Sequence, residues 1–400
     1  MDKRKWIGLV IFSLVVGGLV GILEVIFGKV LLMLTDWRVS YFGYLILFLP
    51  LAGLFIEWLY TRFGGKSRQG MGLIFDAGHG ETKEVPLRLI PIVIVSTWLT
   101  HLFGGSAGRE GVAVQIGGAL SHWMSQRKWH VFLPKDNMPQ IALITGMAAG
   151  FSGLFQTPMA AVLFALEVLV VGKLEIRALL SASIASFTAY FISAYLGLEK
   201  FSFFIESRLD FTPLLVVKLV VLGLLFGLVG RFFSASLAKG KSIAKRLIPN
   251  NYQRIFIGGI LIAILIFVIH HGRYAGLGSN LISASLAGEP IYSYDFLLKI
   301  LFTILTLSVG FQGGEVTPLF AIGSALGAVV APLIGLPVAV VAAIGYMTVF
   351  GSATNTFLAP ILIGGEVFGY ELMPVFFVTM CVAYSCNGNQ SIYGKQKILN

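Results

Sequence analysis

The sequence predicts an all-α integral membrane protein, and three observations support that fold class. Of the 400 residues, 56% are apolar and 12% are charged, a balance that is not typical of soluble proteins. Several apolar runs are long enough to cross a hydrocarbon core about 30 Å thick, which takes roughly 20 helical residues. No run alternates apolar and polar residues, as the strands of an outer-membrane barrel would. We therefore expect a multi-pass helical protein in a lipid bilayer.

The simplest predicted spans are the longest apolar runs, residues 6–34, 41–60, 213–237 and 255–269. The first run is too long for a cleavable signal peptide and has no Ala-x-Ala-like cleavage site, so it is interpreted as a retained helix.

The formal net charge of +10 lies in short connections between apolar runs. Membrane topology explains this distribution better than nucleic-acid binding does, because loops on the cytoplasmic side carry an excess of Lys and Arg. The basic clusters at residues 3–5, 62–68, 239–246 and 395–397 place both termini in the cytoplasm. No long hydrophilic stretch interrupts the chain, so we expect a single transport domain over residues 1–400 without a regulatory cytosolic domain.

Two glycine-rich segments half a chain apart resemble each other. Residues 108–120 align with residues 314–326, and both contain an Ile-Gly-small-Ala-Leu core. A second match follows in the same order and superposes residues 156–168 on residues 355–367, including a Glu-Val pair. Two ordered matches favour a duplication over chance similarity, although they do not reveal whether the halves are parallel or inverted. The expected units are halves 6–198 and 212–385, followed by a C-terminal helix 386–400.

Four apolar segments are interrupted by glycine and are predicted to contain broken helices: residues 104–120, 146–171, 310–330 and 338–369. Irregular backbone at membrane depth is tolerated only where protein or a watery cavity covers it. A helix that begins there presents free N–H groups and the positive end of its dipole. Broken helices at matching places in two halves are typical of an ion site near the midplane. The sequence therefore predicts anion coordination by helix N-termini.

Glu110 lies at the start of one broken helix, next to Arg109. A carboxylate within the membrane has a functional role by default, and the alternative is a helix cap paired with Arg109. An ionised carboxylate takes the place of an anion, whereas a protonated one withdraws and carries a proton. Glu110 could thus combine gating with proton coupling. Glu315, in the matching segment, is a second candidate proton site or a local cap.

Glu167 and Glu366 occupy equivalent places in the two halves, which favours a structural role at neighbouring helix ends. Asp76, His79 and Glu81 could form a metal site, but a loop explains them better, and we expect neither a metal nor a cofactor.

Residues 104–108 match the G-x-S-x-G pattern of serine hydrolases. An intramembrane serine protease would use Ser106 with a histidine such as His101 or His270. That elbow needs a strand before its helix, and the position of Ser106 is Gln312 in the other half. We therefore expect a transporter rather than an enzyme. A third alternative, a carrier for organic solutes, would need a roomier and more polar cavity.

These motifs resemble the CLC family of anion channels and proton-coupled anion antiporters. Residues 70–74 (GMGLI) stand where that family usually has G-S-G-I-P, and residues 108–112 (GREGV) stand where it has G-(K/R)-E-G-P. Residues 314–318 (GEVTP) stand where it has G-x-F-x-P. Residues 388–393 (GNQSIY) fit the last helix of the family, which contributes a pore tyrosine, here Tyr393.

The resemblance implies a homodimer with one pore per subunit, each pore built from two inverted halves with many tilted and broken helices. It implies that Glu110 is the gating and proton-transferring residue. It also implies a set of fluoride-binding or pore-lining residues: Met71, Gly72, Gly108, Arg109, Gly111, Val112, Glu315, Val316, Thr317 and Tyr393.

Departures from the usual motifs resemble the fluoride-exporting branch, often called CLC-F. Met71 replaces a serine that would contact chloride, and Val112 replaces a proline. Val316 replaces the phenylalanine of G-x-F-x-P, where the branch has a G-E-V-T-P-like segment. Val168 stands where chloride/proton exchangers carry an internal glutamate. These departures imply a bacterial plasma-membrane antiporter that exchanges fluoride for protons; the alternative is a chloride channel or chloride/proton exchanger on the same scaffold.

Overall fold

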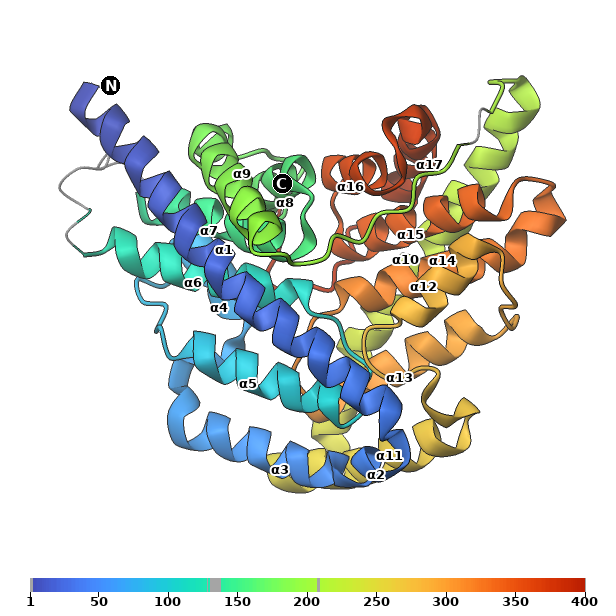
Figure 1. Cartoon of the computed structure of the whole chain (residues 1–400), viewed down its shortest axis with the longest axis horizontal. Coiled ribbons are helices and arrows are strands. Elements are labelled where there is room, and N and C mark those ends of the chain that lie inside the picture. Colours follow the sequence, from blue (N-terminus) through green and yellow to red (C-terminus); the bar gives the residue numbers. More distant parts are fainter. Residues whose placement is uncertain (1–2, 128, 130–137, 207–208, 400) are drawn as a thin grey trace.

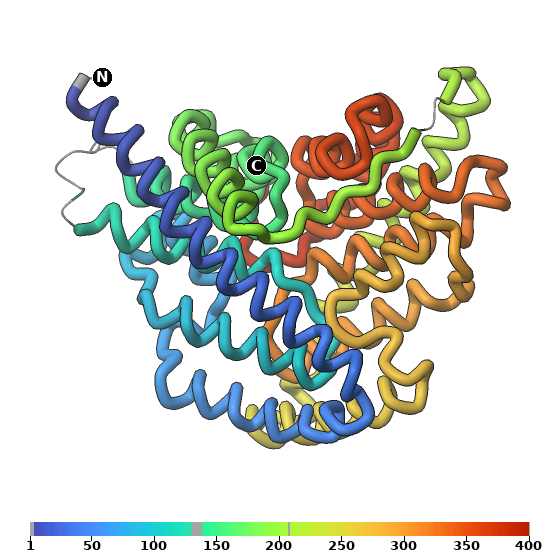
Figure 2. Tube along the Cα trace, viewed as in Figure 1, coloured from blue at the N-terminus to red at the C-terminus, as the bar shows by residue number. Residues whose placement is uncertain are grey.

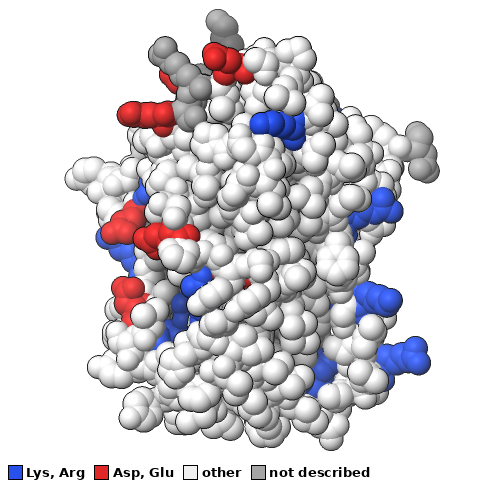
Figure 3. Space-filling view, turned by 90° about the vertical axis from the view of Figure 1, so that its right-hand side faces the viewer, with Lys and Arg blue, Asp and Glu red and all other residues white. Residues whose placement is uncertain are grey.

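A computed structural model describes residues 3–127, 129, 138–206 and 209–399. Its helices cross one another at a range of tilts, and α1 (Lys3–Ser40) runs diagonally over the other helices (Figures 1 and 2). The surface in Figure 3 is mostly uncharged. Seven described segments are long and apolar enough to cross a membrane: Arg4–Ser40, Phe42–Gly78, Met138–Phe155, Ile176–Tyr195, Pro213–Leu247, Asn251–Val268 and Val316–Ile334. The multi-pass helical prediction is confirmed.

Helices of the first half recur in the same order in the second half. The pairs are α1 with α10 (Pro213–Leu247), α3 (Leu49–Leu59) with α11 (Asn251–Val268), α4 (Met71–Gly78) with α12 (Ser279–Ala287), α5 (Leu89–Leu102) with α13 (Asp295–Val309), α6 (Glu110–Ser125) with α14 (Val316–Ile334), α7 (Met138–Phe155) with α15 (Val338–Thr354), α8 (Pro158–Glu167) with α16 (Leu358–Phe368), and α9 (Leu179–Tyr195) with α17 (Met373–Cys386). The short helix α2 (Phe42–Leu45) follows α1.

The two halves meet at an antiparallel bridge between Gly108 and Gly314. The amide of Gly108 donates to the carbonyl oxygen of Gly314 at 2.5 Å, and the amide of Gly314 donates to that of Gly108 at 2.7 Å. An antiparallel pair that exchanges both bonds has two-fold symmetry. Because the sequence alignment equates these same two glycines, a local two-fold axis relates the two halves at this point, as the expected inverted repeat requires.

Glu167 and Glu366 extend this symmetry to the ends of α8 and α16. The carboxylate of Glu167 accepts hydrogen bonds from the first amides of α16, including that of Ala359 at 2.8 Å. The carboxylate of Glu366 accepts from the first amides of α8, including that of Ala160 at 2.9 Å. Each half thus caps a helix of the other half, which confirms the predicted structural role.

Glycine allows the long core helices to touch. Gly117 of α6 lies directly against the backbone of Gly146 on α7, and Gly323 of α14 lies in the same way against Gly345 on α15. In both pairs a side chain would collide with a main-chain carbonyl. Small residues at such crossings are the usual means of close helix packing in membranes, where the hydrophobic effect gives little drive for association.

The predicted C-terminal helix 386–400 is wrong. Helix α17 ends at Cys386, and β2 (Lys397–Ile398) pairs in parallel with β1 (Val170–Val171). Gly388 (φ 63°) and Asn389 (φ 57°) adopt the left-handed conformation that terminates helices. Downstream, the amide of Ile392 donates to the carbonyl of Ala353 at 2.9 Å. The segment that carries Tyr393 is therefore irregular and packs on α15.

Candidate functional site

Helices α6 and α14 begin beside each other, and the side chain of Glu110 bridges them. The Glu110 carboxylate accepts from the amide of Thr317 at 3.1 Å and from its hydroxyl at 2.7 Å to Oε1 and 2.5 Å to Oε2. Glu110 is 1% exposed. The carboxylate lies where the N-terminus of α14 would attract a free anion.

Arg109 lies next to Glu110 without hydrogen-bonding to it through its side chain. Its Nε is 3.9 Å from Glu110 Oε1, whereas its backbone amide donates to Glu110 Oε2 at 3.2 Å. Nε and Nη1 of Arg109 are buried and have no hydrogen-bond partner among the described residues. The carboxylate thus has a long ion pair and a backbone hydrogen bond to Arg109, while its shortest contacts are to Thr317 of the other half.

A cavity of about 290 Å³, which we call the vestibule, lies next to this junction. Five of the residues predicted to form the pore line it: Met71, Gly72, Gly111, Glu315 and Tyr393. The Tyr393 ring packs on Phe75 with ring centroids 5.1 Å apart. Although the helix predicted around Tyr393 is absent, the tyrosine lines the vestibule.

Three cations also line the vestibule: Arg68, Lys241 and Lys395. Lys241 Nζ is 3.6 Å from Glu315 Oε1. Lys395 pairs with Asp76 and hydrogen-bonds to Gln69 at 3.4 Å. Each of the three cations is paired with a carboxylate, Arg68 with Glu57, Lys241 with Glu315 and Lys395 with Asp76, so the lining carries both signs of charge.

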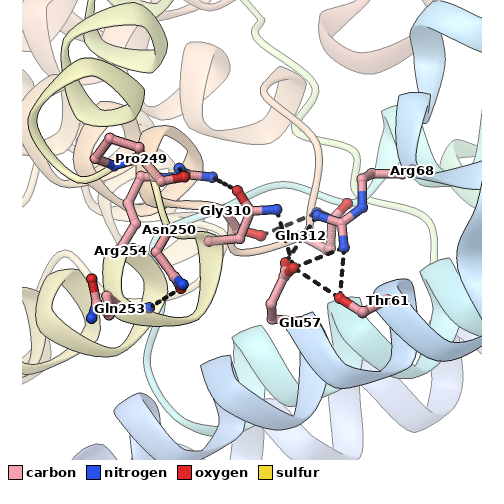
Figure 4. A network of polar contacts seen from close by, with 10 residues as sticks. Glu57, Thr61, Arg68, Pro249, Asn250, Gln253, Arg254, Gly310 and Gln312 are labelled. Atoms are coloured by element: carbon pink, nitrogen blue, oxygen red, sulfur yellow. Dashed lines mark hydrogen bonds and ion pairs between the residues drawn. The ribbon is translucent and has the colours of Figure 1, made fainter.

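Arg68 is fixed by Glu57 of α3 (Figure 4). Its Nη2 donates to Glu57 Oε1 at 2.7 Å and to the Thr61 hydroxyl at 3.0 Å. Asn251 of α11 donates to the same Glu57 oxygen at 3.2 Å. This network joins the two halves at the edge of the vestibule.

The other predicted pore residues do not line the vestibule. Gly108 faces Gly314, and a methyl group there would lie 3.1 Å from the amide nitrogen of Thr317. Val112 and Val316 are buried, at 0% and 1% exposure. The structure thus divides the predicted set into residues of the vestibule and residues of the Glu110 junction.

The serine-hydrolase alternative lacks its dyad. The Ser106 hydroxyl lies 3.0 Å from the Thr303 hydroxyl and accepts from Lys299 Nζ at 2.9 Å. The ring nitrogens of His101 contact the carbonyl oxygens of Thr97 and Ala107.

The described residues contain no group of His, Cys, Asp and Glu that could hold a metal ion. Among the candidate metal ligands, His79 contacts the carbonyl oxygen of Leu169 at 3.0 Å through Nε2. Glu81 pairs with Lys397 at 2.6 Å, and this hydrogen bond lowers the pKa of Glu81.

Two buried ionisable residues near the site could not be recognised as site residues from the sequence. Glu24 of α1 and Lys299 of α13 are both fully buried. Lys299 Nζ donates to Ser106 and to the carbonyls of Tyr274 and Gly276, which fixes the loop before α6. Each interrupts an apolar run, and an ionisable residue within a span is by itself a signal of function.

The chain is similar to several known membrane transport proteins. A chloride/fluoride channel protein of Pseudomonas syringae pv. tomato is 37% identical over 370 residues, which is 91% of this chain and 80% of the relative. The crystal structure of a CLC-type fluoride/proton antiporter is similar with a TM-score of 0.96 and 51% identity, and the match covers 100% of both chains. A slow cyanobacterial Cl⁻/H⁺ antiporter has the same fold, with a TM-score of 0.83 at 22% identity and coverage of 98% of this chain and 97% of that one. The family model for voltage gated chloride channels matches residues 52–388. This chain therefore belongs to the voltage gated chloride channel family, which is the CLC family that the motifs resemble.

Proposed function

We propose that this protein is a fluoride/proton antiporter that exports fluoride and is gated and proton-coupled by Glu110. The observation that carries the proposal is the Glu110 carboxylate at the N-terminus of α14, held by the amide and hydroxyl of Thr317. The fluoride/proton antiporter that is similar over the full chain supports fluoride and protons as the transported ions.

The proposed cycle follows from competition for the helix end. Ionised Glu110 accepts the Thr317 hydrogen bonds and excludes other anions from that place. Protonation removes its charge, so fluoride from the vestibule takes the helix end and the neutral carboxyl moves away with its proton. Return of the ionised carboxylate then displaces fluoride. Because one position serves both anions in turn, fluoride movement is tied to proton movement in the opposite direction.

The basic residues of the vestibule support its orientation. Arg68, Lys241 and Lys395 belong to three of the basic clusters that the positive-inside rule places in the cytoplasm. We propose that the vestibule opens there and receives fluoride for export, with both termini on the same side. The homodimer implied by the family resemblance remains a prediction. Val168 is buried, and a valine cannot carry a proton, so this position does not supply an inner proton route.

Fluoride is favoured over chloride by the polar groups at the junction. Fluoride is small and strongly hydrated, so a selective site must replace its water with closely packed donors, and Thr317 offers both an amide and a hydroxyl. The second candidate, a chloride channel or chloride/proton exchanger, is kept because the Pseudomonas relative is named for both ions.

Flux from proteoliposomes tests the proposal. Purified protein should release fluoride faster than chloride from the same vesicles, and an outward fluoride gradient should drive proton uptake. Glu110→Gln should remain folded and abolish the coupled proton movement. Equal chloride flux would favour the second candidate, and unchanged coupling in Glu110→Gln would remove Glu110 from its assigned role.

A further inference from the structure

Glu24 is a buried acid near the Glu110 junction that the proposed cycle does not use. It lies in the middle of α1 and is 0% exposed. Neither carboxyl oxygen has a hydrogen-bond partner among the described residues. An unpartnered carboxyl in the membrane interior is costly, and such residues mark ion or proton pathways.

The Glu24 side chain is packed between neighbouring helices. Its side chain lies against Gly153 of α7, where a methyl group would be 3.2 Å from Glu24 Cγ. The same added methyl group would be 3.5 Å from Ala189 Cβ of α9. Helices α1, α7 and α9 thus enclose the carboxyl, and glycine at position 153 provides the space for it.

The packing of α6 on α7 brings Arg109 toward Glu24: Gly150 of α7 lies against the carbonyl of Ala113, one turn after Arg109, and Gly153 of the same helix lies against Glu24. Arg109 interacts electrostatically with Glu24 and with Glu110. Its Nε and Nη1 are buried and unpartnered, as the oxygens of Glu24 are. Buried donors and acceptors in natural proteins are almost always satisfied, through ordered water where protein groups are out of reach. We therefore expect bridging water between Glu24 and Arg109.

Buried Tyr346 of α15 also interacts electrostatically with Arg109 and Glu110, and the other titratable groups to consider lie on helices next to α1. On the described helices packed against α1 they are Tyr44 of α2, His101 of α5, Glu110 and His122 of α6, and Tyr190 and Tyr195 of α9; α7 has none. Both histidines are engaged by backbone carbonyls. One guanidinium is therefore shared by two buried carboxyl groups.

We propose that Glu24 is a second proton-binding site of the transport cycle and exchanges its proton with Glu110 across Arg109. With Glu110 ionised and Glu24 protonated, the three side chains have no net charge. In the exchange, the O–H bond of Glu24 breaks, the proton passes along water, and an O–H bond forms on Glu110, while Glu24 becomes the counter-charge of Arg109. The net charge stays zero, which avoids an uncompensated charge in the low-dielectric interior.

The inference rests on the proposed proton-coupled function, and the first test is transport by Glu24→Gln, which keeps the shape but cannot release a proton. Glu24→Gln should bind fluoride in calorimetry as wild type does, and its fluoride-driven proton uptake should fall roughly tenfold or more. Glu84→Gln, on a side chain that is 77% exposed, is the matched control and should behave as wild type. Unchanged proton uptake in Glu24→Gln would overturn the inference, and so would a joint loss of fluoride binding, which would mean a purely structural role.

Infrared difference spectroscopy separates this inference from the proposed function. Wild-type protein should show the carbonyl band of a protonated, buried carboxyl that is absent in Glu24→Gln. In Glu110→Gln that band should weaken, because Arg109 then has only Glu24 as a counter-charge and favours its ionisation. If fluoride drives no proton uptake by the wild-type protein, the antiporter proposal fails. The infrared band would still show whether Glu24 and Glu110 share the charge of Arg109. A band that is the same in wild type and Glu110→Gln would refute the exchange.

Discussion

Thr317 holds the carboxylate of Glu110 with two different groups, its backbone amide at 3.1 Å and its hydroxyl at 2.7 Å. Glu110 begins α6 of the first half, and Thr317 lies in the first turn of the matching helix α14 of the second half. The proposed gate is therefore closed by a contact between the two repeats, to which the Thr317 amide and hydroxyl both contribute.

Thr317→Val removes that hydroxyl and keeps the shape of the side chain. A hydrogen bond to a charged group contributes about 1.5–3 kcal/mol, so ionised Glu110 should leave the helix end more often. We expect fewer protons moved per fluoride, and a lower ratio of fluoride to chloride flux because the same hydroxyl is a proposed donor to fluoride, with both measured in proteoliposomes. Thr317→Ser keeps the hydroxyl and is the control. Equal coupling in the valine and serine variants would show that the hydroxyl does not hold the gate.

The reciprocal caps made by Glu167 and Glu366 predict a stability difference. Glu167 accepts from the amide of the residue before α16 and from the first two amides of that helix, whereas Glu366 accepts from two amides of α8. Loss of a helix cap costs about 0.5–2 kcal/mol. Thermal unfolding in detergent should therefore show a larger loss for Glu167→Ala than for Glu366→Ala. The reverse order would contradict the hydrogen-bond count as the cause.

The repeat could be predicted from the sequence because short segments of the two halves have matching residues. Alignment equated Gly108 with Gly314 and Glu167 with Glu366, and the structure pairs the first two directly. Inversion could not be predicted, because a sequence match is the same for parallel and inverted halves. The exchange of caps between the halves likewise appears only when the helix ends are placed in space.

Site residues that belong to a sequence motif, such as Glu110, could be proposed from the sequence. Residues that are brought to the site only by tertiary packing could not. Glu24 does not belong to a recognisable motif. Its proposed role depends on Arg109 and Gly153, which are distant in the sequence. The helix predicted at the C-terminus failed because Gly388 and Asn389 end it. Local turn chemistry there outweighed the family pattern.

Gly108→Ala tests the junction of the halves. An added methyl group would lie 3.0 Å from the Gly314 carbonyl oxygen and 2.8 Å from Pro318 Cδ, so the bridge between the halves would have to open. We expect lower thermal stability and loss of fluoride flux. Gly43→Ala is the matched control, because its methyl group would meet only Phe267 at 3.9 Å and alanine favours helices. A Gly108→Ala protein as stable and active as wild type would show that the close approach is not needed.

Lys241 is predicted to set the fluoride affinity of the vestibule through Glu315. Its Nζ is 3.6 Å from Glu315 Oε1, and its side chain is 48% exposed, so the pair itself adds about 1 kcal/mol or less to stability. Lys241→Gln leaves the Glu315 charge uncompensated in the path, which should repel fluoride and weaken its binding several-fold at low salt. The difference should shrink as salt rises, because exposed charges are screened. Lys239→Gln, on the same helix but outside the vestibule, should bind as wild type does. Calorimetry of Lys241→Gln with Glu315→Gln decides the cause: the double variant should recover affinity, and failure to recover would mean that Lys241 does not act through Glu315.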